Sequence, residues 1–321
     1  MILMRSLAVV LITVLVAMSS LAQPYPSKPI RLLVPFGPGG VGDITSRAVM
    51  QKMGEAMNQQ IIIDNRPSAG GIVATETVAK SEPDGYTLYL MNNTNAVSAA
   101  MFKKLPYDTV RDFEMVSTIG AFSIVVLVAP ESPAKTLKEL IAQAKASGGK
   151  YNIGSINIGT TQYLAAELLK SMAGLDATSV PFNNTAGVLT ALRGNSVQVA
   201  MEFLPPVLGQ IRANTLRAIA VSSATRSPML PNIPTLAESG LPGYEVNSWN
   251  GIAVAAKTQK AIVERLNREI HAAVNSPLIA QRFQELGVST NLSTPDGMRK
   301  LVIDEIAKWN ALIDKAGIQR L

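Results

Sequence analysis

The chain has 321 residues, with 29 Lys and Arg against 23 Asp and Glu, one His and no Cys. The lack of Cys excludes disulfides and thiolate metal sites, and a single His excludes a metal site built from several histidines. The formal charge of +6 comes from dispersed basic residues, which argues against nucleic acid as a partner and is compatible with an anionic ligand.

The first 22 residues have the pattern of an export signal. Arg5 precedes an apolar run over 7–18, and the small residues Ser20 and Ala22 follow at the spacing that a signal peptidase accepts. We therefore predict a cleaved signal peptide, a mature chain that starts near Gln23 and a periplasmic location. The alternative is an uncleaved membrane anchor, although the apolar run is shorter than the roughly 20 residues of a spanning helix.

Strand and helix patterns alternate in the first part of the mature chain. Strands are predicted over 30–36, 59–65 and 86–92, and helices over 43–57 and 70–80. This βαβαβ order implies a parallel sheet with right-handed crossovers.

The same alternation restarts after residue 124. The predicted strands are 124–129, 151–155, 177–182, 197–202, 216–223 and 249–256, and the predicted helices are 136–147, 161–174, 186–194, 205–214, 258–275 and 295–316. A loop rich in Pro and Gly over 227–243 precedes the last strand.

Two βαβ units followed by a long return segment predict an α/β fold with two domains and a mainly parallel sheet in each. We predict a discontinuous domain 1 over 23–123 and 225–321, and a domain 2 over 124–224. A single long sheet is the alternative.

The loop between the first strand and the first helix is the sharpest local feature. It reads VPFGPGGVGD over 34–43 and places free backbone N–H groups at a helix N-terminus, where a carboxylate or phosphate is favoured. Asp43 has an alternative role as the N-cap of the helix. The ligand contacts predicted from this loop are Phe36, Gly37, Pro38, Gly39, Gly40, Val41 and Asp43.

The same loop also matches G-x-G-x-x-G at Gly37, Gly39 and Gly42, and Asp64 follows at the spacing of an acid that binds a ribose. The alternative function is therefore a dinucleotide-binding oxidoreductase of the Rossmann type. Pro38 removes an N–H group from the loop, and export removes the chain from the main nucleotide pools, so this function ranks second.

Further polar loops follow strands at the same predicted sheet edge, beyond which open parallel sheets bind ligands. The loop GSINIGTT over 154–161 repeats in domain 2 the placement of the first loop, although Thr160 or Thr161 has an alternative role as a helix N-cap. The ligand contacts predicted from these loops are Asn93, Thr94, Asn95, Ser155, Asn157, Gly159, Thr160, Thr161, Asn184 and Glu202.

His271 falls in a helical pattern with no nucleophile motif near it. The sequence has no paired-carboxylate motif, no P-loop lysine and no metal-ligand cluster. We therefore predict a protein that is not an enzyme, with no catalytic residue, no metal and no cofactor.

Several motifs, in order along the chain, resemble those of the Bug family of extracytoplasmic solute receptors, the binding proteins of tripartite tricarboxylate transporters. The motifs are YPSKPIRLLVPFGPGG (25–40), IDNRPSAGG (63–71), PDGYTL (83–88), LPYDTVRDF (105–113), PNIPTLAESGLPGYE (231–245) and SWNG (248–251). Each is weak alone, and together they are specific and cover the mature chain.

The resemblance implies a two-domain binding protein of the Venus-flytrap type. It implies that a ligand carboxylate is held between Phe36–Asp43 and Ser155–Thr161, and that the closed form then docks to the membrane subunits of the transporter. We expect a monomer that captures a small organic carboxylate. A sensor that hands its closed form to a signalling partner is a third interpretation.

The chain departs from the usual family pattern at several site positions. Asn157 replaces a Gly, Thr160 a Ser and Glu202 an Asp, while Tyr163 and Asn95 occupy places where His is common. These changes imply a pocket of altered size with more amide donors, still suited to a carboxylate. Trp249 either walls an aromatic ligand or belongs to the core.

Overall fold

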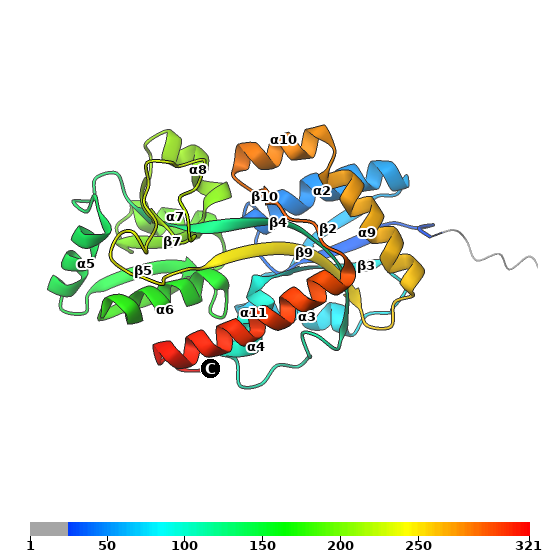
Figure 1. Cartoon of the computed structure of the whole chain (residues 1–321), viewed down its shortest axis with the longest axis horizontal. Helices are drawn as coiled ribbons and strands as arrows, with labels where there is room; N and C mark the ends of the chain where they lie inside the picture. Colours follow the sequence, from blue (N-terminus) through cyan, green and yellow to red (C-terminus); the bar gives the residue numbers. More distant parts are fainter. Residues whose placement is uncertain (1–24) are drawn as a thin grey trace, which may run out of the picture.

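The computed structural model describes residues 25–321, and the predicted signal peptide over 1–22 lies outside them. The chain forms two lobes that lie side by side along the longest axis of the molecule (Figure 1). Within the described residues, no helix is both long enough and apolar enough to cross a membrane.

The first lobe begins with the predicted βαβαβ order. Its elements are β1 (Ile30–Val34), α2 (Val41–Met57), β2 (Ile61–Asn65), the 3-10 turn η1 (Ala69–Gly71), α3 (Ile72–Ala79), β3 (Thr87–Asn92) and α4 (Asn93–Met101). β1 pairs in parallel with both β2 and β3, which confirms the pairing expected from the alternation.

Helix α4 replaces the polar loop that the sequence predicts after β3. Asn92 caps the helix, because its side chain accepts the N–H of Thr94 at 2.9 Å, and the side chain of Asn95 accepts the N–H of Asn92 at 3.1 Å. Asparagine and threonine favour turns and helix N-caps alike, so the same polar run is compatible with both structures.

The second lobe repeats the alternation. Its elements are α5 (Leu137–Ala146), β5 (Tyr151–Ile156), α6 (Thr161–Ala173), β6 (Ala177–Phe182), α7 (Thr185–Arg193), β7 (Val199–Phe203), α8 (Leu204–Arg212) and β8 (Arg217–Val221). β5 pairs in parallel with β6 and β7, as the pattern predicts.

Two long strands join the lobes. β4 (Phe113–Val128) pairs with β9 (Asn247–Ala255) through residues 113–123, and with β7 and β8 through residues 124–128. All these pairs are antiparallel. The chain leaves the first lobe along β4 and returns to it along β9. The strand therefore changes partners between Ser123 and Ile124.

One mixed sheet consequently runs through both lobes, in the order β2-β1-β3-β9-β4-β7-β5-β6, with β8 and β10 (Ser289–Thr290) also paired to β4. The expected parallel pairing holds inside each group of three strands, and the linking strands add the antiparallel pairs. The two-lobed arrangement and the alternative of a long sheet are thus both features of this molecule.

Ser222, at the end of β8, joins three chain segments where the lobes meet. Its side chain accepts the N–H of Ile124 at 2.9 Å and donates to the carbonyl of Val246 at 2.5 Å. Its backbone N–H donates to the carbonyl of Ile124, and its own carbonyl accepts the N–H of Val246. Because Ser222 is fully buried, water cannot replace these hydrogen bonds.

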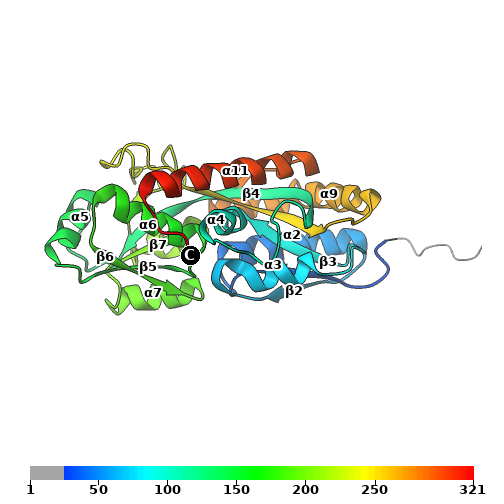
Figure 2. The same ribbon diagram turned by 90° about the horizontal axis from the view of Figure 1, so that it is seen from below.

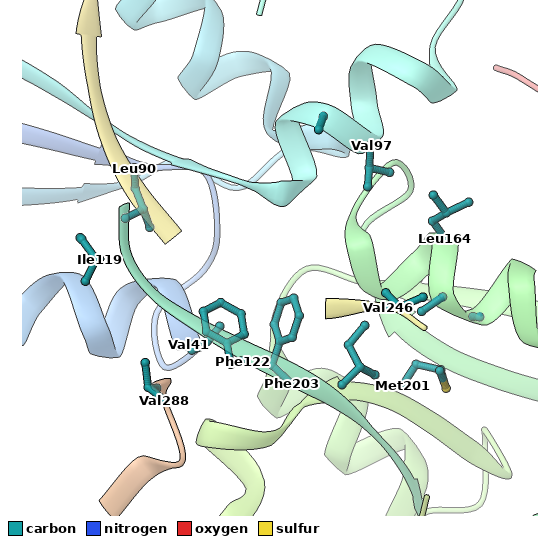
Figure 3. Packing of buried hydrophobic residues seen from close by; sticks show 14 of the residues in the cluster. Val41, Leu90, Val97, Ile119, Phe122, Leu164, Met201, Phe203, Val246 and Val288 are labelled. Carbon is teal, nitrogen blue, oxygen red and sulfur yellow. The ribbon is translucent and has the colours of Figure 1, made fainter. Parts of the chain in front are cut away.

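The hydrophobic core is continuous across this junction (Figure 3). Phe122 of β4 and Phe203 of β7 pack edge to face with ring centroids 4.7 Å apart. Val41 of α2 lies close to them in the same view. Burial of these side chains ties the two lobes together by the hydrophobic effect.

Three C-terminal helices complete the structure, α9 (Lys260–Val274), α10 (Pro277–Leu286) and α11 (Pro295–Ala316). Helices near the first and last of these are predicted, whereas α10 is not. α11 runs along the molecule across the junction and contacts α4, β4 and α6 (Figure 2). The indole N–H of Trp309 in α11 donates to Asn93 of α4 at 2.9 Å.

We predict that Ser222→Ala lowers the free energy of unfolding by about 1–3 kcal/mol, because it leaves the buried N–H of Ile124 without a partner. The neighbouring Ser223→Ala is the control, with an expected change within about 0.5 kcal/mol, since its hydroxyl bonds only the carbonyl of Thr225 at the surface. Urea unfolding measures both. Equal effects of the two substitutions would contradict a structural role for Ser222.

Candidate functional site

A cavity lies between the lobes at the ends of the strands. From the first lobe it is lined by Phe36, Gly37, Gly40, Val41, Gly42, Asn92, Ser248 and Asn250. From the second lobe it is lined by Ile156, Gln162, Asn183, Asn184, Thr185, Glu202 and Phe203.

The N-terminal ends of five helices line this cavity. Gly40 and Asn92 are the N-cap residues of α2 and α4 in the first lobe. Asn184 and Phe203 are the N-cap residues of α7 and α8, and Gln162 is the second residue of α6. Each helix N-terminus carries unpaired N–H groups and a partial positive charge, so the cavity attracts negative charge although no Lys, Arg or His lines it.

The Gly-rich loop reaches the cavity through its backbone. α2 begins at Val41, two residues earlier than expected, and its N-cap Gly40 makes no side-chain hydrogen bond. A Cβ atom placed on Gly37 would lie 3.0 Å from the Cβ of Asn184 and 3.2 Å from the carbonyl oxygen of Asn183. Glycine at this position therefore permits the close approach of the two lobes.

Asp43 is not the N-cap of α2, which corrects one of the two roles considered for it. It lies in the first turn, where its Oδ2 accepts the N–H of Gly39 at 3.0 Å. Its Oδ1 accepts hydrogen bonds from Arg47 at 2.9 Å and from Asn65 at 3.0 Å. Burial opposes ionisation, but the hydrogen bonds from Arg47, Gly39 and Asn65 outweigh it and hold the pKa of Asp43 below its usual value.

Helices α6 and α7 present their capped ends from the second lobe. Thr160 is the N-cap of α6, because its hydroxyl accepts the N–H of Tyr163 at 3.2 Å and donates to the carbonyl of Ile156 at 3.1 Å. The side chain of Asn184 accepts the N–H of Gly187 at 2.8 Å and caps α7 in the same way. The capping role considered for Thr160 is confirmed.

Glu202 stands at the end of β7 and is 1 % exposed. Its Oε1 accepts the N–H of Phe203 at 2.7 Å and the amide N–H of Gln162 at 3.1 Å. Its Oε2 has no hydrogen-bond partner, nor has the Oε1 of Gln162. Burial raises the pKa of Glu202, although the hydrogen bonds from Phe203 and Gln162 and the nearby hydroxyl of Thr185 act in the opposite direction.

Six of the residues predicted to bind a ligand line the cavity, namely Phe36, Gly37, Gly40, Val41, Asn184 and Glu202. Pro38 and Gly39 belong to the same loop but not to the lining. Thr94, Ser155 and Asn95 are buried, and Asn95 accepts a hydrogen bond from the hydroxyl of Tyr89 at 3.2 Å.

Asn93, Asn157, Gly159 and Thr161 lie instead at contacts between the lobes. Asn93 donates to the hydroxyl of Thr161 at 3.5 Å, and Asn157 donates to the carbonyl of Ser68 at 3.4 Å. The carbonyl of Gly159 accepts the hydroxyl of Ser98 at 3.1 Å. The loop over 154–161 therefore mainly forms contacts between the lobes beside the cavity, and only its Ile156 lines the cavity.

Nine lining residues are not among the ligand contacts predicted from the sequence. They are Gly42, Asn92, Ile156, Gln162, Asn183, Thr185, Phe203, Ser248 and Asn250. Most of them are sequence neighbours of a predicted contact, so the polar segments at the strand ends could have identified them. Ser248 and Asn250 come from β9, and only the SWNG motif marks them.

Trp249 belongs to the core, where it is 5 % exposed, and does not line the cavity. His271 lies on α9, and its Nε2 is 3.1 Å from the hydroxyl of Ser117 and 3.1 Å from the carbonyl oxygen of Ser293. Ser117 is fully buried and away from the cavity, so this contact is structural. Among residues 25–321, no group of His, Cys, Asp and Glu side chains is arranged to hold a metal ion.

Comparison with known proteins gives a consistent result. Residues 45–318 match the model of the tripartite tricarboxylate transporter family receptor. The protein BugT of Bordetella pertussis is 32 % identical over 320 residues, which cover 98 % of each chain.

Solved structures agree with this match. The structure of Rpa4515 from R. palustris with adipate has a TM-score of 0.88 and 31 % identity, and the match covers 92 % of this chain and 100 % of that one. The structure of MatC from Rhodopseudomonas palustris with bound malate has a TM-score of 0.86 and 28 % identity, with 90 % and 100 % covered.

We predict that Asp43→Asn lowers the free energy of unfolding at pH 7 by about 1–3 kcal/mol, because it weakens charge-assisted hydrogen bonds at the start of α2. A carboxyl group with a lowered pKa stabilises the folded state above its unfolded pKa near 4 and loses this effect as the pH falls through the folded pKa. The difference between the two proteins should therefore shrink below about pH 4.

Urea unfolding at pH 7 and at pH 3 tests this. Asp304→Asn is the matched control, since Asp304 makes an exposed pair with Lys300, worth less than about 1 kcal/mol. A difference for Asp43→Asn that is the same at both pH values would show that the ionised carboxylate does not anchor the loop.

Proposed function

The chain belongs to the tripartite tricarboxylate transporter receptor family, and from this premise we propose that it is a periplasmic binding protein for a small organic carboxylate. The ligand lies in the cavity between the lobes. The protein binds this ligand without catalysing a reaction. It acts as a monomer, and its closed complex with the ligand docks to the membrane subunits of a tripartite tricarboxylate transporter.

The observation that carries this proposal is the convergence of five helix N-termini on a cavity that no basic side chain lines. Backbone N–H groups and helix dipoles favour an anion, and a planar carboxylate can accept from several of them at once.

Relatives support the same ligand class. Rpa4515 is described with adipate and MatC with malate, and both are small dicarboxylates. We extend from them only the chemical class, a short acid with at least one carboxylate. The helix ends at Gly40 and Asn184 line the cavity from different lobes and are suited to hold the anchoring carboxylate.

We also propose the two domains expected from the sequence, 23–123 with 225–321 and 124–224, as the bodies that close on the ligand. The support is the change of strand partners in β4 between Ser123 and Ile124, and the hydrogen bonds of Ser222 at the same level. Hinges of this kind absorb a change of backbone angle at a few residues while each body stays rigid.

No specific observation favours the dinucleotide alternative. Asp64, which that function assigns to a ribose, forms ion pairs with Arg31 and Arg66 and lies outside the cavity lining. Pro38 also keeps one N–H group out of the loop. The role of a sensor for a signalling partner uses the same cavity and stays a prediction.

A thermal-shift screen with malate, adipate, succinate, citrate, glutamate and NAD tests the proposed function. At least one acid should raise the melting temperature in proportion to the logarithm of its concentration, because a ligand that binds only the folded state adds about 2.7 kcal/mol at a hundredfold excess over its dissociation constant. A shift with NAD and with none of the acids would favour the dinucleotide function instead.

Substitution of Gly37 by Val tests whether the Gly-rich loop and the second lobe enclose the ligand. The added side chain collides with Asn184, so closure is blocked and affinity for the acid found in the screen should fall at least tenfold. Gly209→Ala in α8 is the control, because open space surrounds that position, and its affinity should stay unchanged. Calorimetric titration measures both. Unchanged affinity in Gly37→Val would place the ligand elsewhere.

A further inference from the structure

Glu202 is the one ionisable side chain that lines the cavity, as far as residues 25–321 are concerned. Its position is unexpected for a cavity that takes an anion, because an ionised carboxylate there would repel a carboxylate ligand in a site with little water. The side chain is also almost completely buried, which disfavours its charged form.

The hydrogen bonds around Glu202 show a missing donor. The side chains of Gln162 and Glu202 form one hydrogen bond, in which Nε2 of Gln162 donates to Oε1 of Glu202 at 3.1 Å. The other oxygen of each group, Oε2 of Glu202 and Oε1 of Gln162, is buried and has no partner. Two buried acceptors without a donor are costly in a folded protein, and an ionised Glu202 has no proton to offer.

We propose that Glu202 carries a proton on Oε2 in the folded protein at neutral pH, shares it with Oε1 of Gln162, and thereby keeps the cavity open to anionic ligands. In this pair each group donates once to the other, as a carboxylic acid and an amide do. The effect on ligands rests on the proposed function, whereas the proton itself is a property of the chain without any ligand.

No nearby charged side chain is placed to stabilise the ionised form of Glu202. β7 packs against β4, β5, α6, α7 and α8, and α2 faces it across the cavity. The ionisable groups on these elements are Glu114, Tyr151, Tyr163, Glu167, Lys170, Arg193, Arg212, Asp43, Arg47, Lys52 and Glu55. None of them lines the cavity or bonds to Glu202.

Several of these groups are already paired with one another. Glu167 bonds to Lys170, and Asp43 bonds to Arg47. No cation is therefore placed to hold Glu202 ionised. Burial raises its pKa, in agreement with the hydrogen-bond pattern.

The first experiment uses the protein without ligand and compares wild type with Glu202→Gln as a function of pH. Glutamine keeps an oxygen that accepts from Phe203 and Gln162, and its NH₂ group replaces the acid proton permanently. An acid with a raised folded pKa stabilises the protein fully below its unfolded pKa near 4.3 and loses stability as the pH rises through the folded pKa.

The melting temperature of Glu202→Gln minus that of wild type should therefore grow between pH 5 and pH 8. A difference that stays flat or shrinks over this range overturns the proposal. Infrared spectroscopy of the wild type at pH 7 is an independent measurement. It should show the carbonyl stretch of a buried protonated carboxylic acid, and absence of this band overturns the proposal even if the variant fails to fold.

The second experiment measures the affinities for malate and adipate from pH 5.5 to pH 9. For an acid that binds, the wild-type affinity should fall at least tenfold once Glu202 ionises, and Glu202→Gln should not show this fall. If glutamate binds instead, and Glu202→Gln weakens it at least tenfold at pH 7, an ionised Glu202 pairs with the ligand ammonium and the proposal is wrong.

The two proposals fail in different ways. If no acid binds at any pH, the proposed function fails, while the melting difference and the infrared band still decide whether Glu202 is protonated. If an acid binds with the same affinity from pH 5.5 to pH 9 and the infrared band is missing, the proposed function stands and the protonated pair is wrong.

Discussion

Strand β4 is the element on which both halves of the protein depend. It pairs with β9 in the first lobe and with β7 and β8 in the second, so neither sheet half is complete without it. Ser222 adds buried hydrogen bonds to Ile124 and Val246 at the level where the partners change. The covalent chain, the sheet and the core all cross at this level. The cavity lies beside this crossing, between residues of both lobes.

In the proposed function, the cavity holds an anion through the backbone instead of through basic side chains. Helix N-termini supply fixed partial charges that need no counter-ion and do not titrate. They also leave the walls free for amides such as Asn183 and Gln162, which offer both donors and acceptors. Glu202 is the ionisable residue of the lining, so the protonation of its carboxyl group decides whether that wall is neutral or negatively charged.

The sequence predicts much of this arrangement, for reasons that are local. The loop over 34–43 combines Gly, Pro and a following helix, and the polar ends of strands identify Asn184 and Glu202. Helix α2 begins two residues earlier than predicted, because the carboxylate of Asp43 accepts the N–H of Gly39 from within the first helical turn. Gln162, Ser248 and Asn250 depend on which strands become neighbours, and α4 depends on a cap built from asparagines that also favour turns. These features are decided by tertiary contacts that single-chain periodicity does not contain.

The contacts between the lobes beside the cavity are made largely by the main chain. The N–H of Gly70 donates to the carbonyl of Ile158 at 2.7 Å, and the carbonyls of Gly70 and Gly159 both accept the hydroxyl of Ser98. A Cβ atom on Gly159 would lie 2.4 Å from the ring of Phe102, so this clasp, formed by Gly70, Ser98, Ile158 and Gly159, requires small residues outside the cavity lining. Substitutions at wall positions outside this clasp, such as Asn183 or Gln162, consequently leave its hydrogen bonds intact.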